Sequence, residues 1–358
     1  MSGLAPLRYQ PARDSAARRE LHAGLEQHLR DTGEHRFGNG WLHAKAALLA
    51  AVSALCYALA LRSHAALPFT LWFGASLFCA MLMAMNWLHD AAHNALFRAP
   101  RWNRVALRIA ALAVGIDTHY WTIRHVHFHH TYANIDGYDL DIEPNPFLRQ
   151  TPFQRWAPQY RYQHLYWPLV AALSLPYLVW YSDWADCFGS TPVTSRARQG
   201  RAAFLGWKLA HVLLVLALPV WALHGSGIGW PAVLLAYLLG QMLASCFLVA
   251  LILGTHWAEV EFFQPGADGT MAHDWHRHAF LTSCDWSPRP RWLGYWMGGL
   301  NRHLTHHLFP TVSHRHYLAL AAMVEEVSAR HQLGYRNLSY RQLAASQQQF
   351  LKSMGRAP

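Results

Sequence analysis

Four long apolar runs limit the fold of this chain more than any other feature. They cover residues 42–61, 67–87, 204–222 and 231–254, and each approaches the roughly 20 residues that a helix needs to cross a bilayer core. Hydrophobic residues make up 53% of the chain and charged residues only 14%, which is unusual for a soluble protein of this size. We therefore predict an all-α integral membrane protein with four transmembrane helices in two hairpins. The alternative, buried core helices of a large soluble protein, rarely places such runs side by side.

The distribution of basic residues predicts the orientation of the four spans. The two loops inside the hairpins, residues 62–66 and 223–230, contain one basic residue, Arg62. Nearly all other Lys and Arg residues lie in the N-terminal arm, in residues 88–203 or in the C-terminal region. By the positive-inside rule this side is cytoplasmic. Topology and attraction to anionic headgroups explain most of the formal charge of +10, and no basic helix with base-stacking aromatics indicates a nucleic-acid partner.

Shorter segments outside the spans predict further helices. Leu21, Leu25 and Leu29 recur every four residues within 14–30, which indicates an amphipathic helix on the headgroups or against the cytosolic domain. The apolar stretches 105–116 and 165–181 are too short to span, so we expect interfacial helices there. The five cysteines form no C-x-x-C pair and are interpreted as packing residues.

These observations predict a division of the chain into three parts. They are a cytosolic N-terminal arm (1–40), a membrane domain (41–310) and a cytosolic C-terminal helical tail (311–358), whose polar Gln-rich end we expect to be frayed.

Three histidine clusters indicate a metal centre. They are His89 and His93; His125, His129 and His130; and His303, His306 and His307. Residues three or four apart share a helix face, and neutral imidazole binds Zn, Cu, Fe and Ni. Eight ligands exceed the need of one ion, so two neighbouring ions are predicted, and the absence of thiolate spacing favours iron over structural zinc.

The clusters lie where predicted spans end. The second span ends near Trp87 and the fourth near Gly254, so His89, His93 and His256 are expected at the cytoplasmic face. A metal site at the mouth of a helical bundle would be open to an apolar substrate from the membrane. In an α-helix His127 would point about 200° away from His125, so we exclude it from the ligands.

Metal-bound imidazoles need partners for their second ring nitrogen. Candidate residues are Asp90, Asn94, Asp136, Asp139, Asp141, Glu143 and Asn301. Helix capping and loop solvation are an equally simple explanation for the acidic and amide residues. His119 is expected to be such a partner or a structural residue, and His22, His28, His35 and His43 are expected to be structural or on the surface.

The histidine clusters resemble the three histidine boxes of the membrane fatty acid desaturase family. The boxes read HDAAHN at 89–94, HVHFHHTYANIDGYDLDI at 125–142 and GGLNRHLTHHLFP at 298–310. GTHWAEVEF at 254–262 and WHRHAFLTS at 275–283 resemble segments of the branch that includes bacterial acyl-lipid and front-end desaturases. The resemblance runs from Trp41 through Tyr317.

This resemblance implies a four-span helical protein with a cytosolic cap, a nonheme diiron centre and a bent tunnel for an acyl chain. Matched residue by residue, it implies that the ligands are the eight clustered histidines with His256 as a ninth, and that His278 is an outer partner. Two positions depart from relatives: His303 stands where front-end members commonly have Gln, and Ile252 stands where stearoyl-type members have an Asn near the metal.

The expected activity is that of an O2-dependent acyl desaturase with two Fe ions, in a bacterial inner membrane with its catalytic face cytoplasmic. Alternatives are a hydroxylase, ketolase or acetylenase on the same scaffold, or a metal- or haem-binding transporter. The acyl chain would be carried on CoA, acyl carrier protein or lipid. Because no HPGG or GxGxxG segment occurs, we expect electrons from a separate ferredoxin or cytochrome b5 type donor with its reductase, docked by basic residues such as Arg98, Arg101, Arg104, Arg289 and Arg291.

Overall fold

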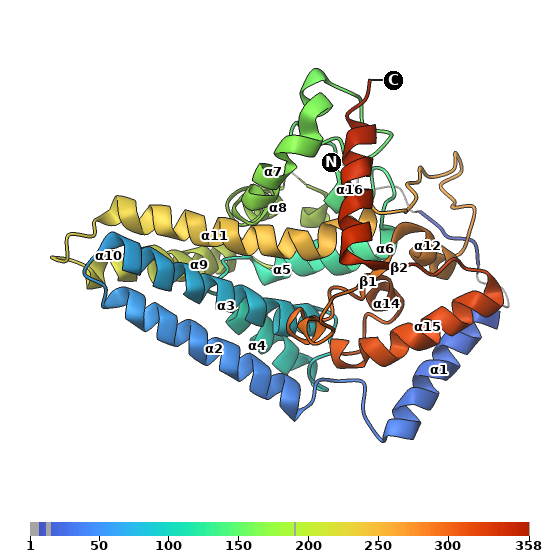
Figure 1. Cartoon of the computed structure of the whole chain (residues 1–358), viewed down its shortest axis with the longest axis horizontal. Coiled ribbons are helices and arrows are strands. Elements are labelled where there is room, and N and C mark those ends of the chain that lie inside the picture. The colour runs from blue at the N-terminus through green and yellow to red at the C-terminus, as the bar shows by residue number, and fades with distance from the viewer. Residues whose placement is uncertain (1–6, 12–15, 190, 358) are drawn as a thin grey trace. The chain divides into compact units, whose positions relative to one another are not determined.

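The computed structural model describes residues 7–11, 16–189 and 191–357, most of which are helical (Figure 1). The helices are α1 (Ala16–Thr32), α2 (Gly40–Leu61), α3 (Ala66–Ala92), α4 (Pro100–Ala111), α5 (Thr118–Thr122), α6 (His130–Tyr132), α7 (Gln163–Tyr177), α8 (Asp183–Phe188), α9 (Arg201–Val212), α10 (Leu218–Ala222), α11 (Trp230–Ile252), α12 (Trp275–Thr282), α13 (Leu293–Trp296), α14 (His303–Leu308), α15 (Tyr317–His331) and α16 (Tyr340–Met354). Strands β1 (Asp285–Ser287) and β2 (Asn337–Ser339) pair in parallel, with Trp286 opposite Leu338.

Two compact units make up the chain, and each is described separately. The histidine unit comprises Met1–Gly38, Arg124–Trp167 and Ala250–Pro358. The span unit comprises Asn39–Ile123 and Pro168–Val249.

Four helical segments among the described residues are long and apolar enough to cross a membrane. They are Gly40–Leu61, Ala66–Ala92, Arg201–Ala222 and Trp230–His256. The third consists of α9, a π-helical turn (Leu213–Ala217) and α10. These segments match the four apolar runs, so the prediction of a mostly helical, multi-pass integral membrane protein is confirmed.

Small residues let the long helices of the span unit pack closely. α2 and α3 form a hairpin (Figure 1), in which Ser53 Oγ donates to the Ser76 carbonyl and Ser76 Oγ donates to the Ser53 carbonyl, both at 2.9 Å. A Cβ atom at Gly240 of α11 would lie 2.6 Å from Leu77 Cδ1 of α3, so a larger residue there would require the Leu77 side chain to move. The core consists of Ala60, Phe69, Phe73, Leu77, Val215, Leu223, Ile228, Val233, Ala236 and Tyr237.

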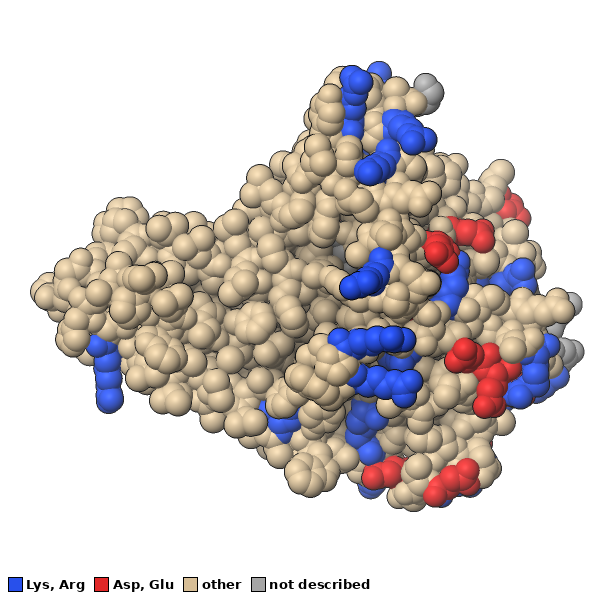
Figure 2. Space-filling view, in the orientation of Figure 1, with Lys and Arg blue, Asp and Glu red and all other residues tan. Residues whose placement is uncertain are grey.

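The outer surface of the long helices is apolar. Figure 2 shows few Lys, Arg, Asp or Glu side chains over α2, α3 and α11. Leu55, Leu71 and Leu235 are more than half exposed there, as expected for side chains that face lipid tails. The shorter apolar stretches are helical as well, in α4 and in α7, which continues through a π-helical turn (Leu178–Ser182) into α8.

Helices α1 and α15 lie side by side in the histidine unit (Figure 1). α1 corresponds to the predicted amphipathic helix, of which residues 14 and 15 lie outside the described part of the chain, and it packs on protein through Leu21. The core around it consists of Ala17, Leu21, Ala279, Phe280, Leu304, Leu308, Phe309, Val312, Tyr317, Leu320, Val324 and Val327.

The expectation of a frayed Gln-rich end is wrong. Residues 340–354 form helix α16, which begins with a capping box between Ser339 and Gln342. Leu343, Gln347 and Leu351 are buried because they recur every four residues on one face of the helix. The parallel pairing of β1 with β2 was not predicted, since three-residue strands carry no usable periodicity.

Candidate metal centre

The third histidine group is presented by the short helix α14. His303, His306 and His307 occupy its first, fourth and fifth positions, and each is at most 4% exposed. Spacings of three and four residues place all three rings on one side of the helix. This arrangement is the one that the spacing predicted.

Two residues of the second histidine group, His125 and His129, lie on a π-helical turn and not on the α-helix that we expected, and the third, His130, begins α6. The π-helical turn runs from Ile123 to His129, directly before α6. A π-helix has more residues per turn than an α-helix, so His125 lies beside His130, with their Nε2 atoms 3.2 Å apart. The rings of His125 and His129 are 5.7 Å apart. π-Helical turns often mark functional sites. The sequence did not predict this one, because the spacing of the second histidine group is equally compatible with an α-helix.

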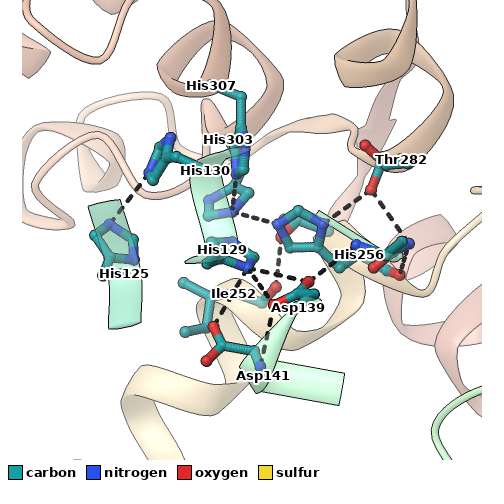
Figure 3. A network of polar contacts seen from close by, with 12 residues as sticks. His125, His129, His130, Asp139, Asp141, Ile252, His256, Thr282, His303 and His307 are labelled. Carbon is teal, nitrogen blue, oxygen red and sulfur yellow. Dashed lines mark hydrogen bonds and ion pairs between the residues drawn. The ribbon is translucent and has the colours of Figure 1, made fainter. Parts of the chain in front are cut away.

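Four histidines of the histidine unit converge in a first cluster, formed by His129, His256, His303 and His307 (Figure 3). One ring nitrogen of each lies within 4.8 Å of those of the others. The Nε2 atom of His303 is 2.7 Å from Nε2 of His256 and 3.2 Å from Nε2 of His307. Three sequence segments that are distant along the chain thus supply one group of donors.

A second cluster consists of His125, His130 and His306. His130 Nε2 is 3.2 Å from His125 Nε2 and 2.9 Å from His306 Nε2. The rings of His130 and His307 stack with centroids 4.2 Å apart. The two clusters are therefore neighbours within the same unit.

The other ring nitrogens have outer partners that orient the imidazoles. His256 Nδ1 donates to the Thr282 carbonyl at 2.8 Å, and His129 Nδ1 lies 3.2 Å from an oxygen of Asp139. His306 Nδ1 is 2.7 Å from the Tyr317 hydroxyl. Because a carbonyl oxygen can only accept, the proton of His256 is on Nδ1, and the lone pair of Nε2 faces the cluster.

The surroundings shift the pKa values of two histidines of the first cluster in opposite directions. Burial alone lowers the pKa of His129, but the carboxylates of Asp139 and Asp141 outweigh it and raise this pKa to about 9. Burial and the neighbouring histidines hold the pKa of His307 well below its usual value. Neutral imidazole is the form that binds metal, so His307 is ready to bind, whereas His129 must release the proton that Asp139 and Asp141 favour when a metal ion binds.

This donor set fits a bound metal ion. Two imidazole nitrogens at about 2.1 Å from one ion lie roughly 3 Å apart, and the Nε2 separations in the two clusters range from 2.7 to 3.2 Å. Hydrogen bonds between the imidazoles cannot satisfy all of these close nitrogens, because each neutral imidazole carries only one proton. Imidazole donors suit iron, zinc, copper and nickel.

The first histidine group lies in the span unit. His89 is in the last turn of α3 and His93 follows its end, both 5% exposed, with ring centroids 5.4 Å apart. Asp90 is buried beside them, whereas Asn94 is exposed in a left-handed backbone conformation (φ 53°).

Among the remaining candidate partners, His278, Asn301 and His119 contact the backbone, and Asp141 lies near His129. His278 Nε2 is 2.7 Å from the Ala133 carbonyl and Asn301 Nδ2 donates to the Trp286 carbonyl at 3.0 Å. Asp141 lies 3.4 Å from His129 Nδ1. His119 accepts hydrogen bonds from the backbone of Arg198 and Gln199, a structural role.

His127, the N-terminal histidines and Ile252 lie outside the two clusters. His127 is half-buried in the π-helical turn. Of the N-terminal histidines, His43 stacks on Phe97 and His28 Nε2 lies 3.0 Å from His316 Nδ1. Ile252 offers no ligand atom.

Thr282 and Tyr317 were not predicted as partners of the histidines. Thr282 acts through its backbone carbonyl, and any residue type has one. Tyr317 follows His307 by ten residues and ends the region of family resemblance, but no local pattern connects its hydroxyl to His306.

Comparisons with known proteins agree with this geometry. A model of the family described as fatty acid desaturase matches residues 63–339. The chain is 29% identical to the sn-1 linoleoyl-lipid 6-desaturase of Synechocystis sp., over 75% of this chain and 76% of that protein. It is 27% identical to an acyl-lipid (8-3)-desaturase of Physcomitrium patens, of which it covers 55%, and 26% identical to fatty acid desaturase 3 of Bos taurus, of which it covers 56%.

Proposed function

The chain belongs to the fatty acid desaturase family, whose members are nonheme diiron oxidoreductases, and from this premise we propose that it introduces a C=C bond into an acyl chain in an O2-dependent reaction. The observation that carries the proposal is the pair of adjacent imidazole clusters in the histidine unit. Two sets of converging nitrogens match the need of a two-metal site for two groups of ligands.

We propose that two Fe ions are bound by nine histidines. The ligands are His89, His93, His125, His129, His130, His256, His303, His306 and His307. Seven of them form the two clusters of the histidine unit, and the family motif supports His89 and His93. Asp139 is proposed as the carboxylate that orients His129, with Asp141 beside it.

The reaction removes one hydrogen from each of two adjacent methylenes. O2 accepts these two hydrogens together with two electrons and two protons, and two water molecules form. Bound iron supplies the O2 activation and the oxidising power that an unactivated C–H bond requires. The chain fixes the donors: the carbonyl of Thr282 holds the His256 proton on Nδ1, and Asp139 does the same for His129. Burial of His303, His306 and His307 excludes bulk water from the centre.

The proposed substrate is an acyl chain that reaches the centre from the membrane. Two relatives are named as acyl-lipid or linoleoyl-lipid desaturases, so a lipid-bound acyl chain is the first carrier to test, before acyl-CoA and acyl carrier protein. Electrons are proposed to come from a ferredoxin or cytochrome b5 type protein. The positive-inside pattern supports a cytoplasmic catalytic face in a bacterial inner membrane.

The test is lipid analysis of a host that expresses the protein. A host expressing the parent chain should accumulate a new acyl species lighter by two hydrogens, and a host expressing His306→Ala should not. His331→Ala is the matched control, because His331 pairs with Glu20 on the surface, away from both clusters. Equal products from the parent and His306→Ala would refute the proposal.

Product mass and metal content separate the alternatives. A gain of one oxygen would identify a hydroxylase. A purified protein with a haem absorption band, or without iron after growth with abundant iron, would contradict the diiron proposal.

A further inference from the structure

A buried carboxylate in strand β1 holds the helix that carries the third histidine group. Asp285 is 0% exposed. Its Oδ1 accepts the backbone N–H of Thr305 at 3.1 Å, and its Oδ2 accepts the hydroxyls of Thr305 at 2.6 Å and Tyr335 at 2.9 Å. Asp285 contacts none of the histidine ring nitrogens in these bonds, so any effect on them must pass through Thr305.

Helix α14 needs such support because it is short. It has six residues, and its N-cap residue, Arg302, makes no side-chain capping bond. The first N–H groups of a helix have no partner within the helix. Asp285 supplies the acceptor for the N–H of the third residue, Thr305, which lies between His303 and His306.

The same stretch of chain contacts the backbone beside other ligands. Cys284 N–H donates to the carbonyl of Thr255, the residue before His256, at 3.1 Å. Trp286 N–H donates to the Asn301 carbonyl at 2.8 Å, and Asn301 Nδ2 returns a bond to the Trp286 carbonyl at 3.0 Å. β1 itself is fixed by its pairing with β2. The strand is therefore a rigid support that touches the chain next to His256 and on both sides of His303.

We propose that Asp285 is a positioning residue for the metal centre: through Thr305 it sets the rotation of α14 and so aims His303, His306 and His307. This inference rests on the proposed function, because it assumes that these histidines hold iron. A small rotation of α14 would move all three ring nitrogens at once. Loss of an outer partner of a ligand commonly weakens metal binding by about 10–100-fold.

The experiment compares disruptive and conservative variants of the two partners. Asp285→Ala removes the acceptor, and Thr305→Val removes the hydroxyl while leaving the volume nearly unchanged. Asp285→Asn keeps an oxygen for the Thr305 N–H and can donate to the hydroxyls, and Thr305→Ser keeps the hydroxyl. Asp268→Ala is the matched control, because Asp268 accepts the same pair of bonds, from the N–H and hydroxyl of Thr270, at an exposed turn.

Each variant is purified in detergent and stripped of metal, and its thermal unfolding is recorded. Its affinity for Co(II) is measured against a competing chelator, and the absorption spectrum of bound Co(II) is recorded. Thr305→Val and Asp285→Ala should bind Co(II) about 10-fold or more weakly and show a changed spectrum. Asp285→Asn, Thr305→Ser and Asp268→Ala should bind like the parent. If Asp285→Ala does not fold, Thr305→Val decides.

Two outcomes count against the inference in different ways. If the parent binds Co(II) and Thr305→Val binds it equally well with the same spectrum, Asp285 only stabilises the fold and the positioning role is refuted. If the parent itself binds neither Co(II) nor iron, the proposed function fails, and the inference fails with it.

Discussion

Both units bury histidines near carboxylates, yet the histidines have different partners. In the histidine unit, His256 has a carbonyl on Nδ1 and another imidazole nitrogen 2.7 Å from Nε2. In the span unit, His211 Nδ1 is 2.8 Å from the Leu112 carbonyl and its Nε2 is 2.9 Å from the Tyr237 hydroxyl. Burial alone does not identify the proposed ligand, because His211 is fully buried whereas His256 is only partly buried. The surroundings of Nε2 differ: in His256 this atom faces the converging nitrogens of the first cluster, whereas in His211 it faces a single hydroxyl.

Buried carboxylates in the two units also have different partners. Asp139 lies 3.2 Å from the imidazole of His129, whereas Asp183 accepts a hydrogen bond of 2.6 Å from Lys208. Lys208 also donates to the carbonyls of Gly115 and Val179, both at 2.8 Å. The first carboxylate contacts a proposed metal ligand, and the second satisfies a cation buried within the span unit. Substitutions at these two sites should therefore affect metal binding at the first and stability at the second.

The largest contrast is expected between two histidine substitutions. Because loss of an outer partner alone costs about 10–100-fold in metal affinity, loss of the ligand in His256→Ala should exceed about 100-fold and abolish product formation. His211→Gln keeps hydrogen-bonding groups beside the Leu112 carbonyl and the Tyr237 hydroxyl. This variant should contain as much iron per folded chain as the parent. Iron analysis of both purified variants checks this, and equal iron loss in both would remove the distinction between the units.

Lys208→Met should destabilise the span unit by about 3–5 kcal/mol, because it leaves the Asp183 carboxylate buried without its cation. The double variant Lys208→Met/Asp183→Leu should recover much of that loss. Burial raises the pKa of Asp183 to about 7 even beside Lys208, and without the lysine this pKa should rise further. Since the neutral acid is tolerated, the deficit of the single variant relative to the parent should be small below about pH 7, where Asp183 is protonated in both folded proteins, and should grow as pH rises above 7.

Thermal unfolding in detergent at several pH values measures both effects. A deficit in Lys208→Met that does not depend on pH would show that the Asp183 charge is not its cause. Iron per folded chain should remain that of the parent.

Asp139→Asn should weaken metal binding by about 10–100-fold. The amide keeps an acceptor for the backbone but loses the negative charge that strengthens His129 as a donor. Asp268→Asn, at an exposed turn with Thr270, is the control and should not change affinity. Chelator competition measures both variants, and unchanged affinity in Asp139→Asn would contradict the role given to this carboxylate.

The smallest effects are expected from one substitution made in both units. Tyr237→Phe removes the hydroxyl between His211 and Trp180 and should cost about 1–3 kcal/mol of stability without loss of iron. Tyr317→Phe removes the hydroxyl beside His306 Nδ1 and should instead lower metal affinity, by about 10-fold. Unfolding and chelator competition on the same preparations distinguish these results, and the reverse pattern would contradict the comparison.

Local patterns account for what could be predicted. The spans are continuous apolar runs, and the ring directions in α14 follow from i, i+3 and i+4 spacing, so both were accessible from the sequence. The π-helical turn was not, because His125, His129 and His130 fit an α-helix as well. Helix α16 was mistaken for a frayed tail because its polar composition hid a buried face.

By itself, the order of residues determined the four spans, the family and the imidazoles available to a metal, since these depend on runs and spacings within one helix. Only the tertiary structure decided which nitrogens face one another and which partners hold them. Thr282 lies 26 residues from His256 and Asp285 lies 20 residues from Thr305. Such contacts form between segments brought together by packing, and hydrogen-bonding groups common to many residues leave no pattern in the sequence that identifies them.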